Sequence, residues 1–105
     1  MKIKTMELTG AALDWAVTRI EHPEYPLDVT IEYSKDWDYG GPIIERWVSD
    51  LSQRGEWYAQ IQINDVPEYA QATGPTPLVA AMRCYVASQL GDEVDVPDEL
   101  KGESK

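Results

Sequence analysis

Few residues in this sequence have side chains suited to catalysis, and they form no recognisable catalytic set. His22 is the only histidine and Cys84 the only cysteine. Nucleophilic catalysis needs a base within hydrogen-bond reach of the nucleophile. His22 precedes a proline at the expected end of a helix, where a structural or capping role is favoured. Cys84 lies within a predicted helix, which is typical of a buried and inert thiol. One histidine and one cysteine also exclude a Cys/His zinc site.

Acidic pairs and glycine-rich segments are present but lack the patterns that would give them a function. The chain has 19 acidic residues, so neighbouring carboxylates arise by chance. Residues 92–95 lack the ligand spacing and the glycine of a calcium-binding loop. The segments 40–42 and 74–77 contain glycine and proline without the lysine of a phosphate-binding loop. We therefore predict no enzymatic activity, no bound metal and no cofactor.

Aromatic residues that carry a polar group are the most informative feature. The chain has four Trp, six Tyr and no Phe. Such side chains suit interfaces, because they bury a large area at a low cost in conformational entropy. Core packing is the alternative interpretation; it is favoured for Trp57 and remains open for Trp37. The candidate partner-binding residues are the aromatics in and near the predicted loop, with the arginines close to them: Trp37, Tyr39, Arg46, Trp47 and Arg83.

Length, charge and cysteine content restrict the class of protein. A chain of 105 residues supports one domain. Its nine basic and 19 acidic residues give a net charge of −10, which argues against direct nucleic-acid binding and fits a basic partner or plain solubility. No run approaches the 18 or so apolar residues that a membrane span requires. Residues 1–7 lack the apolar core of a secretory signal, and the single cysteine fits a reducing cytoplasm.

The helices and strands that must position these residues are predicted from hydrophobic periodicity and from the positions of glycine, proline and capping residues. Apolar residues at helical spacing predict a first helix that begins after Thr5 or Thr9 and ends at His22. Strict alternation over residues 27–33 predicts a strand, and Gly-Gly-Pro predicts a loop over 34–42. The last helix is marked by an N-capping Thr76, by Pro77 and by Gly91 after its final turn.

Residues 43–51 are ambiguous, because their apolar positions fit either a strand or a helix that starts at Pro42. We prefer a hairpin in which this segment pairs with the alternating residues 57–63 across a turn at 53–56. The predicted fold is a small two-layer α+β domain over residues 1–97, in the order helix, strand, hairpin, helix. About three antiparallel strands pack against two helices. Residues 98–105 are predicted to form an acidic tail, with Val94 and Val96 before it touching the body.

Four segments carry a resemblance to a known family. Residues 7–17, 36–46 without Asp38 and Tyr39, 74–88 and 90–97 resemble, in this order, the NinX-like proteins of lambdoid phages and prophages. The family has no known function, so the resemblance implies a phage or prophage origin and the host cytoplasm, without catalytic residues. A weaker likeness in the arrangement of elements concerns HicB-type antitoxin domains and double-stranded-RNA-binding domains. The lysine cluster of such RNA binders is replaced here by residues 78–80, Leu-Val-Ala.

The leading functional hypothesis is a phage accessory protein that binds a host or phage protein and performs no catalysis. The alternative is nucleic-acid handling, or an acidic mimic of nucleic acid, on a scaffold like that of the RNA binders. Exposed aromatics and an edge strand also favour a homodimer.

Overall fold

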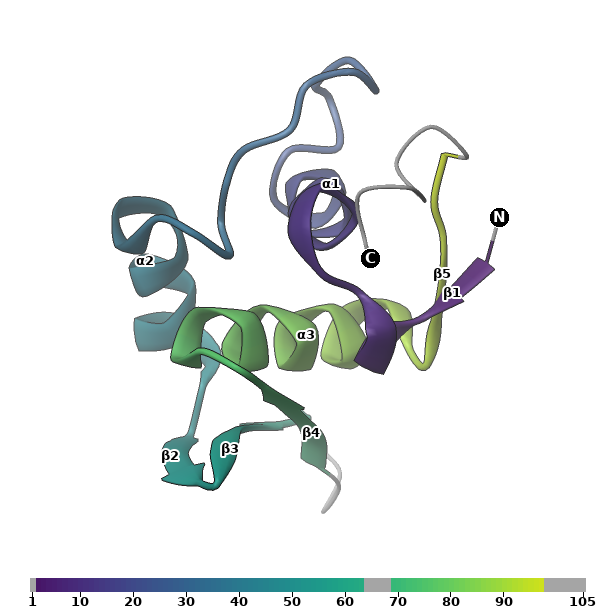
Figure 1. The fold of residues 1–105 in the computed structure, drawn as a ribbon. Coiled ribbons are helices and arrows are strands. Elements are labelled where there is room, and N and C mark those ends of the chain that lie inside the picture. The colour runs from purple at the N-terminus through teal and green to yellow at the C-terminus, as the bar shows by residue number, and fades with distance from the viewer. Residues whose placement is uncertain (1, 64–68, 98–105) are drawn as a thin grey trace.

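The computed structural model describes residues 2–63 and 69–97, and α3 lies at the centre of the fold (Figure 1). The three-stranded sheet packs on one side of α3 and α1 on another, while α2 contacts α3 near its first turn. The elements are β1 (Lys2–Lys4), the 3-10 helix η1 (Thr5–Glu7), α1 (Gly10–Glu21), α2 (Trp37–Trp47), β2 (Asp50–Arg54), β3 (Glu56–Gln62), β4 (Tyr69–Gly74), α3 (Pro77–Leu90) and β5 (Glu93–Asp95).

The central position of α3 follows from its sequence. A helix that is apolar on all sides must be covered on all sides. Neighbours on several sides therefore bury more of α3 than the single stripe expected from the sequence, including Val79, Ala80 and Cys84. Thr76 caps the helix as predicted, since its Oγ1 accepts a hydrogen bond of 3.1 Å from the Val79 N–H. Gly91 follows the last turn with a φ of 87°.

The antiparallel sheet has the strand order β2-β3-β4. A hairpin is present, as predicted, and Gly55 turns the chain between its strands with a φ of 82°, but the predicted first strand over residues 43–51 is wrong for most of its length. Its first strand, however, is confined to Asp50–Arg54, because residues 43–47 complete α2. The third strand is β4, which was not predicted. Small inward residues, among them Ala59, Ala70 and Ala72, let α3 approach the sheet closely.

The predicted strand over residues 27–33 is wrong. This segment belongs to an irregular connector, residues 22–36, between α1 and α2. Side chains of α1 satisfy its backbone groups in place of a neighbouring strand. Trp15 Nε1 donates to the Leu27 carbonyl at 3.1 Å, and the Ile31 N–H donates to Thr18 Oγ1 at 3.0 Å.

The first helix is confirmed as α1, with Thr9 as its N-cap residue and His22 directly after its end. The ends of the chain's described part meet in the short sheet of β1 and β5, where Ile3 pairs with Val94. Val94 and Val96 are buried, as expected, whereas the predicted tail at 98–105 lies outside the described residues. The α+β class is confirmed. No helix in the described part of the chain is long and apolar enough to cross a membrane.

Candidate functional site

The candidate site is built on α2, a helix in the segment where the sequence predicted a loop. Asp36 starts the helix, because its Oδ1 accepts a hydrogen bond of 2.9 Å from the Asp38 N–H. Gly40 and Pro42, the residues that suggested a loop, lie inside it. A Cβ at position 40 would lie 2.5 Å from the Tyr33 carbonyl oxygen and 2.6 Å from Leu78 Cδ2. Glycine is therefore required for the helix to pack closely.

Trp37 and Tyr39 are among the most exposed large side chains of the described residues, at 53% and 49%. Positions i and i+2 of an α-helix are separated by about 200° of rotation about the helix axis, so the rings of Trp37 and Tyr39 lie on opposite sides of α2. Gly41 lies beneath the Trp37 ring, since a Cβ placed there would be 3.8 Å from Trp37 Cε3. Tyr39 meets the buried Tyr33 edge to face, with ring centroids 6.1 Å apart. This exposure excludes core packing for Trp37, the alternative that the sequence left open.

Acidic side chains occupy the solvent-facing side of α2 between these rings. Asp38 and Glu45 are seven residues apart, which places them on one side of the helix about two turns apart. Both are exposed, and neither forms an ion pair with a described residue. We call Trp37, Asp38, Tyr39, Pro42 and Glu45 the α2 surface. Sequence reasoning missed Asp38, Pro42 and Glu45 because their shared face appears only when residues 37–47 are treated as a helix.

Arg46 and Trp47 lie at the end of α2 and take part in its packing. Arg46 Nη2 lies 2.9 Å from Glu21 Oε1, and Glu21 Oε2 accepts a hydrogen bond of 2.5 Å from the Tyr85 hydroxyl. The Trp47 ring lies 6.1 Å from that of Tyr85 and remains 38% exposed. This cluster joins the ends of α1 and α2 to α3. Arg46 and Trp47 therefore hold α2 in place and border the α2 surface.

Arg83 is not part of this site. Its Nε donates to the Leu8 carbonyl at 2.7 Å and its Nη1 to the Thr73 carbonyl at 2.8 Å. Partial burial lowers the pKa of its guanidinium, because desolvation disfavours the charged form. Arg83, which the sequence suggested as a partner-binding residue, thus ties α3 to β4 and to the chain before α1.

All four arginines of the chain have partners inside the fold. Arg19 donates to the Tyr25 and Pro26 carbonyls. Arg54 lies 3.3 Å from Asp50 and stacks over the Tyr58 ring, with 4.4 Å between its Cζ and the ring centroid. Phosphate recognition depends on clustered and accessible arginine and lysine. Such a cluster is absent from the described residues.

The groups that could support catalysis are buried or apart. His22 stacks on Tyr25 at 4.3 Å between ring centroids. Cys84 is buried and donates to the Ala70 carbonyl at 3.2 Å. The residues that the structure describes contain no group of three or more His, Cys, Asp or Glu side chains placed to hold a metal ion.

A cleft of about 640 Å³ opens between η1, β4 and β5, lined by residues that include Lys4, Met6 and Gln71.

Burial raises the pKa of the Cys84 thiol to about 12, because the thiolate would lose its hydration. We expect Cys84 to resist a thiol-reactive disulfide reagent at pH 8 in the folded protein and to react completely in denaturant. Release of the coloured thiol product measures both rates. Rapid labelling of the folded chain would contradict the buried position of this side chain.

Comparison with known proteins identifies one family. Residues 4–89 match the family model described as Bacteriophage P22, NinX. The comparison with family models does not show the likeness to HicB-type domains. No curated protein matches the chain.

Proposed function

The chain belongs to the phage NinX family, and we propose that this phage accessory protein binds a basic surface of a host or phage protein through the α2 surface, without catalysis. The observation that carries the proposal is that strongly exposed aromatic rings lie on one short helix beside carboxylates that form no ion pair with a described residue. Aromatic anchors surrounded by polar side chains are the usual composition of an interaction surface.

The charge of α2 indicates the chemistry of the partner. Asp38 and Glu45 face solvent between the two rings, whereas the basic Arg46 is already paired with Glu21. A partner with lysine or arginine around an apolar pocket would match this arrangement. The net charge of −10 would also speed the approach of a basic protein. We place the interaction in the host cytoplasm, where a single reduced cysteine is expected.

The internal partners of the arginines support a protein as the partner in preference to nucleic acid. Burial of Cys84, stacking of His22 and the lack of a nucleophile–base pair among the described side chains support a role in binding. An acidic mimic of nucleic acid would also bind a basic protein, so it predicts the same class of partner.

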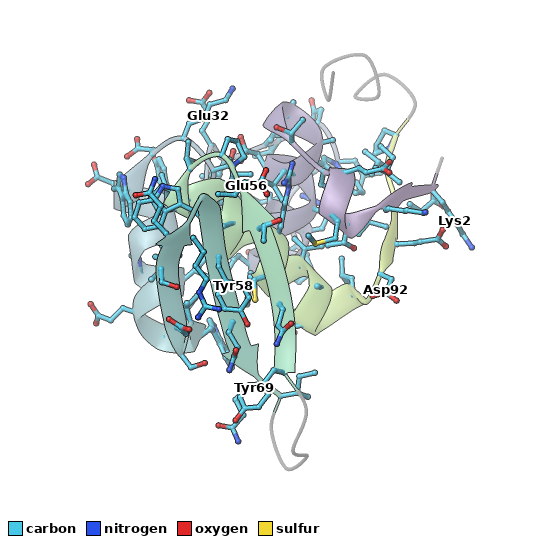
Figure 2. The ribbon with its side chains drawn as sticks, turned by 60° about the horizontal axis from the view of Figure 1, so that its bottom comes forward. Lys2, Glu32, Glu56, Tyr58, Tyr69 and Asp92 are labelled. Carbon is cyan, nitrogen blue, oxygen red and sulfur yellow. The ribbon has the colours of Figure 1, made fainter. Side chains whose placement is uncertain are left out.

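Affinity capture from phage-infected cells tests the proposal, with mass spectrometry of the co-eluting proteins. Trp37→Ala should lose the partner. Tyr69→Ala is the matched control and should keep the partner, because Tyr69 is a similarly exposed aromatic (48%) that lies on the sheet and not on α2 (Figure 2). Hot-spot truncations typically weaken binding by about tenfold or more. The captured protein should be basic and should elute as salt rises. Equal capture by both variants, with both folded, would contradict the proposal.

A further inference from the structure

The outer edge of β2 has no neighbouring strand among the described residues. The sheet order β2-β3-β4 leaves β2 paired on one side only. Alternate residues of an edge strand direct their N–H and C=O groups outward, where another strand can pair with them. Strands at open edges usually carry charged residues that discourage such pairing. β2 has two, Asp50 at its start and Arg54 at its end.

These two charges complement each other in one particular arrangement. Side chains alternate between the faces of a strand, so Asp50, Ser52 and Arg54 share one face. That face is the outer one, because Arg54 stacks there on Tyr58, which Figure 2 shows in front of the sheet. The 3.3 Å separation of Arg54 Nη2 and Asp50 Oδ2 confirms that the two side chains lie on one face.

An antiparallel pair of β2 strands related by a two-fold axis at Ser52 places Asp50 opposite the partner's Arg54. The same axis places Arg54 opposite the partner's Asp50, so both ion pairs form at once. Directly opposed residues have Cβ atoms about 4.5–5.5 Å apart, within reach of these side chains. On the inner face, the half-buried Leu51 would lie opposite the partner's Gln53. The β2 sequence is therefore self-complementary in this register.

We propose that a second copy of this chain pairs with the β2 edge, so that two three-stranded sheets form one continuous antiparallel sheet of six. The occupant is a second copy because the charges match under a two-fold axis. The other open edge is less suited, since Arg83 already binds the Thr73 carbonyl on β4 and the cleft beside Gln71 is bordered by η1. The interface is small, and both copies are acidic, so the dimer is of the weak class.

The dimer is tested with two variants of the chain that carry opposite charge changes in β2, each alone and in a mixture. Asp50→Arg makes the edge wholly basic, and Arg54→Asp makes it wholly acidic; each change opposes like charges at two symmetric positions. Each variant alone should dimerise on the order of tenfold to a hundredfold less tightly. A mixture of the two variants should form a heterodimer, because every opposed pair is again of opposite sign. The ion pair within one chain cannot produce this result.

Sedimentation velocity up to about 1 mM protein, in 0.15 M salt to screen the net repulsion, measures each species. Glu32→Arg and Lys35→Asp give the same changes in net charge at the exposed ion pair of Glu32 and Lys35, and both should dimerise like the wild type. A monomeric wild-type protein over this whole range, or a mixture that stays monomeric, would overturn the proposal.

A cysteine at the symmetry axis gives a second, independent test. The Cα atoms of facing Ser52 residues would lie about 4.5–5.5 Å apart, within the range that a disulfide spans. Ser52→Cys should therefore form a crosslinked dimer on mild oxidation, and Gln53→Cys should not, since its symmetry mate is displaced along the strands. Cys84 does not interfere because it is buried. Equal crosslinking of both variants would contradict this register. The dimer uses β2 and not the α2 surface, so its failure leaves the proposed function standing.

Discussion

Gly40→Ala is expected to destabilise the protein by about 2–3 kcal/mol, as an overpacking substitution at a site with little room to relax. The added methyl group would lie 2.5 Å from the Tyr33 carbonyl oxygen, a backbone atom that cannot rotate away. It would also lie 2.6 Å from Leu78 Cδ2. Either α2 moves outward from α3 or the connector shifts. For a domain of this size the midpoint of thermal unfolding should fall by roughly 4–8 °C per kcal/mol.

The neighbouring glycine provides the matched control. A Cβ at position 41 would meet only the Trp37 ring, at 3.8 Å. Gly41→Ala should therefore leave stability unchanged or raise it by up to about 1 kcal/mol, the difference in helix propensity between the two residues. Thermal and urea unfolding of both variants measure the contrast. Similar stability of the two variants would show that α2 does not pack closely through Gly40.

Asp14→Ala is expected to cost about 2 kcal/mol, because it leaves a buried N–H without an acceptor. Asp14 is 1% exposed, and its Oδ1 accepts a hydrogen bond of 2.7 Å from the buried N–H of Ser34. Asp14→Asn keeps a carbonyl oxygen at this position and should stay within about 1 kcal/mol of the wild type. Urea unfolding at pH 7 measures both, and equal losses in the two variants would contradict the role of this hydrogen bond.

The same carboxyl gives a pH dependence of defined sign. Burial raises the pKa of Asp14 in the folded state above the ordinary value of 3.8, despite its hydrogen bonds with Ser34. The folded state therefore holds this proton up to a higher pH than the unfolded state. The contribution to stability is fully present below the unfolded pKa and is lost as pH rises through the folded pKa. The stability of Asp14→Asn relative to wild type should consequently increase from pH 4 toward neutral pH. A constant difference would contradict a raised pKa.

The elements that sequence patterns identified are those whose signals are local. α1, α3 and β3 each combine a clear periodicity with a flanking cap residue or turn glycine, so neighbouring residues alone indicate them. The other strand of the hairpin had an ambiguous pattern and was misplaced. Cys84 was expected to be inert because it lies within α3, and it is buried there. The extent of burial around α3 was not foreseen, because it depends on neighbours supplied by distant parts of the chain.

The missed elements depend on contacts between distant residues. Residues 27–33 alternate like a strand, but Trp15 and Thr18 of α1 bind their backbone and leave no neighbouring strand for them. Gly40 suggested a loop, whereas glycine is needed at this position because Tyr33, a residue outside α2, approaches the helix closely. Within β4, Ala70 and Ala72 have little intrinsic strand propensity, so the strand is stabilised by the packing of these residues against α3.

In the candidate site, too, features set by local sequence differ from those set by contacts between distant residues. Residue type and local context left Trp37 open between core packing and an interface, and its exposure on α2 excludes core packing. Arg83 was chosen because it is an arginine inside a predicted element, the last helix, near these aromatics. Its carbonyl partners, on Leu8 and Thr73, come from parts of the chain that no local pattern connects.

Photocrosslinking in phage-infected cells tests the central claim, that the α2 surface is where the protein binds its partner, most directly. A photoreactive phenylalanine analogue replaces Trp37 in one variant and Tyr69 in another, since both positions are exposed and only the first lies on α2. We predict a discrete crosslinked product with a basic protein from position 37 and none from position 69. A product from position 69 alone would show that the partner binds the sheet, and the assignment of the α2 surface would be wrong.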